Sequence, residues 1–280
     1  MKNIIGLISF VLIFSNCLET DVNYVLPFEQ QNVAFGFIDS VNGVRVYVGK
    51  NIPVLSKDST GALVGVKVEL WAGQNLVETL KHYEKNVFIT SKNFKLLPNS
   101  NYYFKASTPL SKDSLISEKI AIPTPVSIQK VRYQYVNQQK SKMNIYVDIT
   151  DPIGFNAYNL NIQRFKKDTL FGETITENPL FIPINGYFLN DREFEGRKHT
   201  FVIENINAEE YQNKRFIVMD KIRVTLFNLS KPTYDTFLSF KTPEPGIGDP
   251  FFEPTTITNQ IKNGFGIFGS YSSFNYDLKL

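Results

Sequence analysis

Apolar and polar residues alternate with a period of two along most of this chain, which is typical of β-strands with one buried face. The first clear alternation covers residues 33–37, and it resumes over residues 44–48 after the pair Asn42-Gly43. An Asn-Gly pair between two alternating runs predicts a β-hairpin. Residues 66–70 alternate in the same way. Short strands of this kind predict a β-sandwich over residues 31–122.

Tyr102 follows Leu96-Leu97-Pro98 by the spacing of a known sandwich feature. The stretch resembles the Leu-x-Pro-x-x-x-Tyr corner of fibronectin type III domains, in which the tyrosine ties a loop to the preceding turn. We therefore expect Tyr102 to be structural. Tyr103, its neighbour in the strand, should point to the opposite face.

A second all-β part is predicted after Pro123 and Pro125, two prolines that cannot donate to a sheet ladder. Residues 131–135, 143–149 and 158–162 alternate cleanly, which indicates antiparallel strands with one wet face. A longer strand over residues 216–227 contains Asp220 among apolar positions. A β-bulge would turn Asp220 outward, and the alternative is burial with a partner.

Two short helices are expected in this second part. Ser230 precedes Tyr234, Phe237 and Leu238, which are spaced i, i+3 and i+4 as on the buried face of a capped amphipathic helix. Asn207, with Glu210 three residues later, predicts a second helix start. The predicted fold class is thus all-β: an N-terminal immunoglobulin/fibronectin-III-like sandwich over 31–122, then a second antiparallel β-sandwich over 124–280 with one or two short helices.

The first residues differ from the rest of the chain. Lys2 is followed by an apolar run over residues 4–14, in which Ser9 is the one polar residue, and then by Cys17, the one cysteine of the sequence. This pattern predicts a secretory signal over 1–16, because the run is too short to span a bilayer. It also predicts lipidation of Cys17, with 17–30 as the lipidated tether. The alternative is an ordinary signal peptide that leaves Cys17 as an incidental thiol.

Composition excludes some partners and gives little sign of catalysis. Lys and Arg number 30 against 27 Asp and Glu, and the basic residues are scattered, so no nucleic-acid partner is expected. His82 and His199 stand in no metal or triad pattern. Asp191, Glu193 and Glu195 would share one face of an extended strand, where they could bind calcium or serve a glycosidase, although a solvated strand face is favoured. We predict no catalytic residue, no metal and no cofactor, and hence no enzyme.

A glycine-rich stretch near the end needs a physical reason, because glycine weakens a strand. We expect residues 263–271 to form a strand in which the glycines allow a bend or a close backbone approach. They could serve the interior, under the helix over 230–240. The alternative is an edge where a partner adds by main-chain pairing. The candidate docking residues are Gly264, Phe265, Gly266, Ile267, Phe268 and Gly269.

Residues 258–271 also carry a family resemblance. They resemble the closing Asn-Ile-x-Asn-Gly-x-Gly-Ile-Phe-Gly signature of the Bacteroidota outer-membrane lipoprotein family catalogued as domain of unknown function 4249. The lipoprotein-like start, the strand over 65–70 and the sequence Asp151-Pro152-Ile153-Gly154 agree with that family in order.

The resemblance implies an accessory lipoprotein encoded beside TonB-dependent receptors. The expected function is a non-catalytic accessory or binding subunit of an outer-membrane β-barrel receptor. Membrane lipid, reached through acylated Cys17, would be the other partner. We expect it in the cell outer membrane, on the periplasmic face or the cell surface. The alternative is a stand-alone carbohydrate- or protein-binding surface lipoprotein, and a carboxylate-based hydrolase is a further one.

Overall fold

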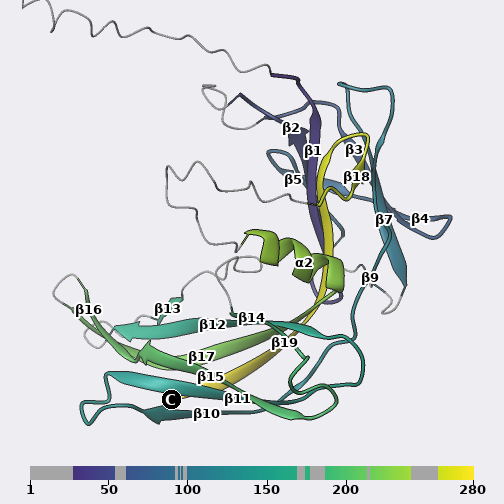
Figure 1. The fold of residues 1–280 in the computed structure, drawn as a ribbon. Coiled ribbons are helices and arrows are strands. Elements are labelled where there is room, and N and C mark those ends of the chain that lie inside the picture. Colours follow the sequence, from purple (N-terminus) through teal and green to yellow (C-terminus); the bar gives the residue numbers. More distant parts are fainter. Residues whose placement is uncertain are drawn as a thin grey trace, which may run out of the picture. The chain divides into compact units, whose positions relative to one another are not determined.

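The structure is a computed structural model that describes residues 28–53, 61–91, 94, 96, 100–168, 174–176, 187–212, 215–240 and 258–280 (Figure 1). The predicted signal over 1–16, Cys17 and the tether up to residue 27 lie outside these residues. Pro98 of the predicted tyrosine corner also lies outside them. Gln31–Leu280 form one compact unit.

Within the described residues, a ten-stranded sheet, called here the long sheet, runs through both predicted domains. Its main path is β13, β12, β17, β19, β1, β2, β6 and β5, with β14 beside β12 and β16 beside β17. Its strands are β1 Asn32–Asp39, β2 Gly43–Lys50, β5 Lys81–Glu84, β6 Val87–Ile89, β12 Ala157–Asp168, β13 Thr174–Thr176, β14 Tyr187–Asn190, β16 Glu209–Gln212, β17 Arg215–Leu229 and β19 Phe265–Lys279.

Two smaller sheets cover the long sheet. The six-stranded sheet contains β3 Lys67–Ala72, β4 Asn75–Thr79, β7 Asn101–Ser107, β8 Leu115–Ser117, β9 Ile120–Ala121 and β18 Ile261–Lys262. The three-stranded sheet contains β10 Ile128–Tyr135, β11 Lys142–Thr150 and β15 Lys198–Asn207.

Each smaller sheet encloses its own core against the long sheet, so the predicted all-β, sandwich-like fold is confirmed. In the first core, Leu70 of β3 and Phe104 of β7 face Val46 of β2 and Phe268 of β19, all fully or almost fully buried. The Phe104 and Phe268 rings meet edge to face at 5.1 Å. The second core lies between the three-stranded sheet and β12, β17 and the later part of β19. Apolar burial against water is the main stabilising contribution in both.

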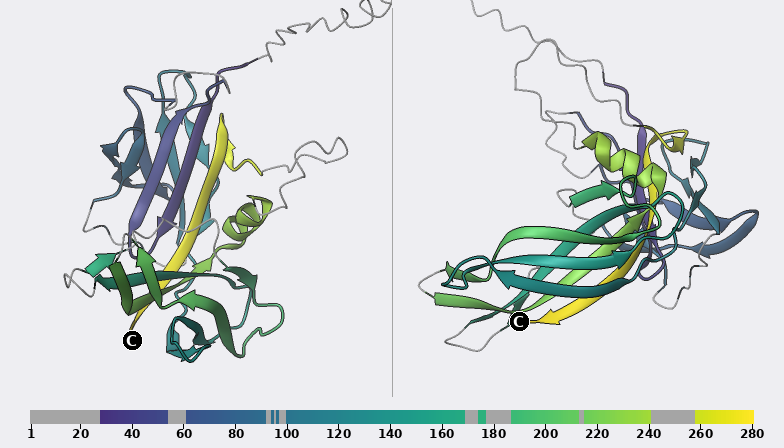
Figure 2. Two further views of the ribbon diagram at one scale, coloured as in Figure 1. Left: turned by 90° about the vertical axis from the view of Figure 1, so that its left-hand side faces the viewer. Right: turned by 60° about the horizontal axis from the view of Figure 1, so that its bottom comes forward.

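Strand β19 belongs to both sandwiches (Figure 2). Its first half runs parallel to β1, from Val33 opposite Phe265 to Asp39 opposite Tyr271. Its second half runs antiparallel to β17, ending with Lys221 opposite Lys279. The sequence division places this strand wholly in the second domain, over 124–280. The structure differs, because the start of β19 completes the sheet of residues 31–122.

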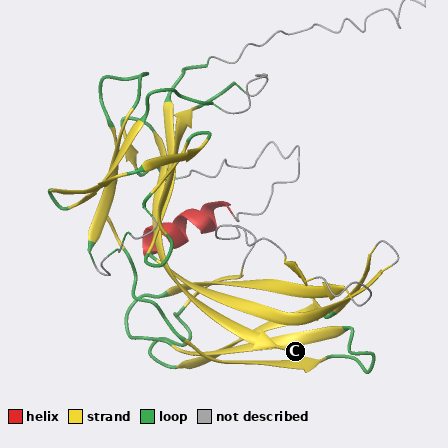
Figure 3. Cartoon of the chain, turned by 180° about the vertical axis from the view of Figure 1, so that it is seen from behind, coloured by secondary structure: helices red, strands yellow, loops and turns green. Residues whose placement is uncertain are grey.

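The predicted helix after Ser230 is present as α2 Lys231–Phe240, and it lies on the face of the long sheet away from the two cores (Figure 3). The Tyr234 N–H donates to the Ser230 carbonyl at 2.9 Å and so begins the helix. Tyr234 and Phe237 pack against Tyr271 of β19. Leu238, expected on the same buried face, is instead 40% exposed.

The second predicted helix, starting at Asn207, is wrong. Asn207 is the last residue of β15, where it pairs with Lys142. Glu209–Gln212 then form β16, which pairs with the start of β17. Strand pairing with neighbours distant in sequence outweighs a local capping pattern worth about 1 kcal/mol.

The structure confirms two local predictions. Asp220 is exposed and skipped in the β12–β17 register, where Phe165 pairs with Lys221 and Lys166 with Met219, so it stands at a bulge. Tyr102 is buried in the first core, whereas Tyr103 stacks on Trp71 on the other face of the six-stranded sheet.

Candidate functional site

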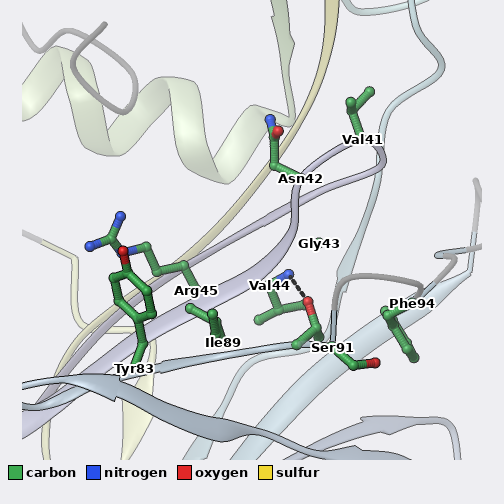
Figure 4. Close-up of a pocket in the computed structure, with 10 residues that line it drawn as sticks. Val41, Asn42, Gly43, Val44, Arg45, Tyr83, Ile89, Ser91 and Phe94 are labelled. Atoms are coloured by element: carbon green, nitrogen blue, oxygen red, sulfur yellow. Dashed lines mark hydrogen bonds between the residues drawn. The ribbon is translucent and has the colours of Figure 1, made fainter. Parts of the chain in front are cut away.

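A pocket of 310 Å³ opens on the long sheet beside the turn that joins β1 to β2 (Figure 4). The turn forms one wall, and β5, β6 and the chain after β6 form the others. Figure 4 shows Arg45 and Tyr83 on one side of the opening and Phe94 on the other. The residues that line it include Val41, Asn42, Arg45, Tyr83, Ile89, Ser91 and Phe94.

The turn is held in one conformation by Asp39, which is fully buried at the end of β1. Its carboxylate accepts hydrogen bonds from the backbone N–H groups of Val41 and Asn42, each at 3.2 Å, and from the Asn42 side chain. Burial raises the pKa of Asp39, and these hydrogen bonds oppose that rise. The Asn42 amide is therefore fixed at the pocket mouth by a carboxylate beneath it.

Gly43 allows the pocket wall to close on β6. Its φ is +81°, and an added Cβ would stand 2.2 Å from the Thr90 hydroxyl. That hydroxyl accepts from the Val44 N–H at 3.0 Å, and the Thr90 N–H donates back to the Val44 carbonyl at 3.1 Å. Any larger residue at position 43 would disturb this pairing.

A pair of opposite charges lies at the rim of the pocket, where Arg45 lines the opening and Glu84 stands beside it. The Arg45 guanidinium lies 3.3 Å from a Glu84 carboxylate oxygen and 5.8 Å from the centre of the Tyr83 ring. On the opposite wall, the Ser91 N–H donates to the Glu78 carboxylate at 2.9 Å. The arrangement combines aromatic surface with hydrogen-bond donors and acceptors, which suits binding of a small polar molecule.

The sequence analysis did not single out Arg45, Tyr83 or Phe94. The one available signal was the Asn42-Gly43 turn, which predicts the hairpin but not what lies beside it. Arg45 and Tyr83 are far apart in the chain, and pairing of β2 and β5 with β6 brings them together.

The predicted row Asp191, Glu193 and Glu195 is not a strand. Residues 191–197 form a turn after β14, because the Phe194 N–H donates to the Asp191 carbonyl at 2.8 Å. Asp191 is buried, and its carboxylate accepts from the Asn156 N–H at 2.6 Å. Glu195 accepts from the Gly154 N–H at 3.3 Å. The prediction that these three residues share a solvated strand face is therefore wrong.

Asp191 instead belongs to a buried polar network that locks the loop over 151–156. Asp151 accepts from the Tyr158 hydroxyl and, at 2.8 Å, from the Gly196 N–H. Burial raises the pKa of Asp151, and these two hydrogen bonds partly offset the rise. The same surroundings raise the pKa of Tyr158, so its hydroxyl stays a donor. Asp151 and Asp191 therefore have a structural role, because their carboxylate oxygens accept hydrogen bonds from other groups of the chain.

The described residues include both histidines of the sequence, His82 and His199. Among the described residues, no three His, Cys, Asp or Glu side chains are grouped so that they could hold a metal ion. His199 stacks on Phe194 at 3.8 Å between ring centres, and burial lowers its pKa. His82 lies in β5, with its ring edge-on to Phe88. Both histidines are strand residues, in β5 and β15.

The glycine-rich candidate docking residues have internal contacts that account for two of their glycines. A Cβ on Gly266 would stand 1.7 Å from the Ala34 carbonyl oxygen of β1. A Cβ on Gly269 would stand 2.8 Å from Phe37 and 2.9 Å from Thr233 of α2. The close approach of β1 and α2 therefore requires small residues here.

The backbone edge of the same residues is also occupied. The Asn259 side chain accepts from the Gly266 N–H at 3.0 Å, and the Gln260 side chain accepts from the Phe268 N–H at 3.0 Å. The Thr233 hydroxyl accepts from the Ser270 N–H at 2.8 Å. A partner strand would have to displace these side chains, so docking through Gly264, Phe265, Gly266, Ile267, Phe268 and Gly269 stays a prediction.

Fold and site together define an all-β protein in which two sandwiches share a long sheet that carries a small, mixed-charge pocket. The chain belongs to the family described as a domain of unknown function, DUF4249, whose model matches residues 18–277. No curated protein matches the sequence. None of the helices in the described ranges is long and apolar enough to cross a membrane.

Proposed function

We propose that the protein is an outer-membrane lipoprotein that acts as a non-catalytic accessory or binding subunit beside a TonB-dependent β-barrel receptor. The observation that carries this proposal is the apolar run over 4–14 that leads to Cys17, the one cysteine of the sequence. Acylation would hold the chain on the membrane, because each buried methylene contributes about 0.8 kcal/mol and two or more chains give a stable anchor.

The described acids support binding rather than catalysis. Catalytic carboxylates face a cleft where they can reach a substrate. Asp151 and Asp191 are buried and accept hydrogen bonds from Tyr158, Gly196 and Asn156. The pocket, by contrast, presents Arg45 and Tyr83 at a solvent-exposed rim.

Membrane fractionation of a Cys17→Ser variant tests the anchor. The wild type should sediment with outer membranes and take up labelled palmitate, whereas the variant should be found in the soluble fraction. A variant that still sediments with membranes, or a wild type that takes up no label, would count against the proposal.

Affinity purification from detergent-solubilised outer membranes tests the partner. We expect a stoichiometric β-barrel protein with the wild type. Phe265→Glu should reduce its recovery if the predicted docking residues make the contact, because Phe265 is 51% exposed at the start of β19. Leu76→Glu in β4, at a position 49% exposed, is the matched control. Recovery of no barrel protein would favour the stand-alone binding lipoprotein.

A further inference from the structure

The pocket beside the β1–β2 turn is built for a ligand of about one ring. Its volume of 310 Å³ lies at the lower end of the range for small-molecule sites. Tyr83 and Phe94 stand on opposite sides of the opening, and Val41 and Ile89 add aliphatic surface (Figure 4). A ligand that fits must therefore present an apolar face.

Charge at the rim argues against an ionic ligand. An anion approaching Arg45 would meet Glu84, which already lies 3.3 Å from the guanidinium, and Glu78 lies behind Ser91 on the other wall. A cation would meet Arg45 itself. Since burying an unbalanced charge is costly, the mixed rim favours a neutral ligand.

The same rim is rich in both donors and acceptors. Arg45 can only donate, whereas the Asn42 amide and the Tyr83 hydroxyl can both donate and accept. Asn42 is already oriented by Asp39 beneath it. A matching ligand would carry several neutral groups that donate and accept side by side, as hydroxyl groups do.

An extended peptide is the other neutral candidate, and the Val44–Thr90 wall of the pocket, unlike the outer edge of β5, disfavours it. Peptides bind sheets largely by main-chain pairing with a free edge. The Val44 N–H donates to the Thr90 hydroxyl and the Thr90 N–H donates to the Val44 carbonyl, so the polar groups at this wall are used. The Asn42 N–H is bound to Asp39.

We propose that this pocket binds a neutral pyranose sugar, with its C–H face against Tyr83 and its hydroxyl groups hydrogen-bonded to Arg45 and Asn42. This assignment rests on the binding role in the proposed function, and it requires neither the lipid anchor nor a barrel partner. A pyranose combines an apolar face with an edge of neutral donors and acceptors, which is the combination that the walls and rim present.

The test uses the full chain with Cys17→Ser, titrated with the methyl pyranosides of glucose, galactose and mannose while backbone amide NMR shifts are followed. We expect at least one glycoside to bind with a Kd on the order of 1–10 mM and to shift the amides of the turn, β5 and β6. Tyr83→Ala and Arg45→Ala should each weaken binding about tenfold or more, with circular dichroism unchanged.

The matched control is Tyr146→Ala. Arg132 lies 5.3 Å from the centre of the Tyr146 ring and pairs with Asp148, so this exposed Arg–Tyr–acid group repeats the chemistry of the pocket rim on the three-stranded sheet. It should leave glycoside binding unchanged. The proposal is overturned if no glycoside shifts the pocket amides, or if Tyr146→Ala weakens binding as much as Tyr83→Ala.

Two further probes test the rejected ligand classes. If 3-phenylpropionate shifts the pocket amides and the glycosides do not, the ligand is an anion and not a sugar. If only the neutral peptide acetyl-Gly-Phe-Gly-amide shifts them, the ligand is a protein segment. Because the anchor and the barrel partner are tested by fractionation and purification, failure here leaves those results standing, and their failure leaves this one standing.

Discussion

Gly266 shows how one residue can carry a constraint that is invisible in a strand pattern. Its φ is +141°, a conformation that side chains rarely adopt, and a Cβ would stand 1.7 Å from the Ala34 carbonyl oxygen. The parallel pairing of β1 and β19 therefore depends on the absence of a side chain at this position. Gly154 has a similar backbone, with φ of +104°, but no atom within 4 Å of an added Cβ.

We expect Gly266→Ala to destabilise the protein by more than about 3 kcal/mol, because backbone strain and a clash with main-chain atoms add together. Gly154→Ala should cost only the strain, about 1–2 kcal/mol. Urea unfolding followed by circular dichroism measures both. Equal losses of stability in the two variants would mean that contact with Ala34 does not matter.

Tyr158 supports a second prediction at the residue scale. Tyr158→Phe would leave one oxygen of the buried Asp151 carboxylate without its donor. The expected cost at neutral pH is about 1–3 kcal/mol, or a fall in Tm of several degrees. Phe201→Leu, a change in the same core without a polar group, is the packing control.

The pH dependence of that cost separates a polar effect from a packing effect. The pKa of Asp151 is already raised by burial, and losing the Tyr158 hydroxyl removes a group that lowers it. Charged Asp151 is then the costly form, so the loss should shrink as pH falls through the carboxyl range and Asp151 takes up a proton. A cost that is the same at pH 4 and pH 7 would contradict this explanation.

At the scale of elements, β17 and β19 are joined on the outer face of the long sheet by an ion pair. Asp277 accepts from Arg223 at 2.7 Å and 2.9 Å and from Lys221 at 2.8 Å. These hydrogen bonds lower the pKa of Asp277, chiefly through Arg223. The group therefore stabilises the folded state above the carboxyl pKa of the unfolded chain.

We expect Asp277→Asn to lose about 0.5–1 kcal/mol at pH 7, since the pair is partly exposed and screened by water. The difference from wild type should disappear as pH falls below the ordinary carboxyl pKa toward the lower folded value. Asp113→Asn in an exposed loop is the control. Urea unfolding midpoints measured between pH 3 and pH 7 check this prediction. A difference in stability between Asp277→Asn and wild type that grows in acid would contradict it.

Elements also show where local patterns mislead. The Ser230 cap and the spacing of Tyr234 and Phe237 predict α2 correctly, because an apolar sheet face is there to receive it. The pattern at Asn207 and Glu210 looks equally helical, yet these residues pair as β15 and β16. Local propensity decides only where no tertiary pairing competes.

At the scale of the whole molecule, β19 joins the two sandwiches by pairing with β1 and then with β17. Its loss would remove a strand from both cores at once. Residues 31–280 should therefore unfold in one cooperative step, despite the proline-marked division near residue 123.

Trp71, the one tryptophan of the chain, lies in the first sandwich, whereas Ile145 is fully buried in the second core. We predict that Ile145→Ala lowers the free energy of unfolding by about 2–5 kcal/mol. The unfolding midpoint followed by Trp71 fluorescence should move as far as the midpoint followed by circular dichroism. Phe104→Ala in the first core is the reciprocal variant. A fluorescence transition unmoved by Ile145→Ala would show two independent domains.

The sequence alone determined the strand-rich class, the β1–β2 hairpin and the helix after Ser230, and it offered the bulge at Asp220 as one of two alternatives. Each depends on side-chain periodicity or turn chemistry within a few residues, so each can be read locally. The family signature over 258–271 was readable for the same reason.

Only the tertiary structure decided which strands pair, because register depends on contacts between residues far apart in the chain. It placed β19 in both sandwiches, buried Asp191 in a polar network while Glu193 and Glu195 stayed exposed, and set Arg45 beside Tyr83 at the pocket. A side chain's neighbours across a sheet follow from strand order, and no local pattern encodes that order.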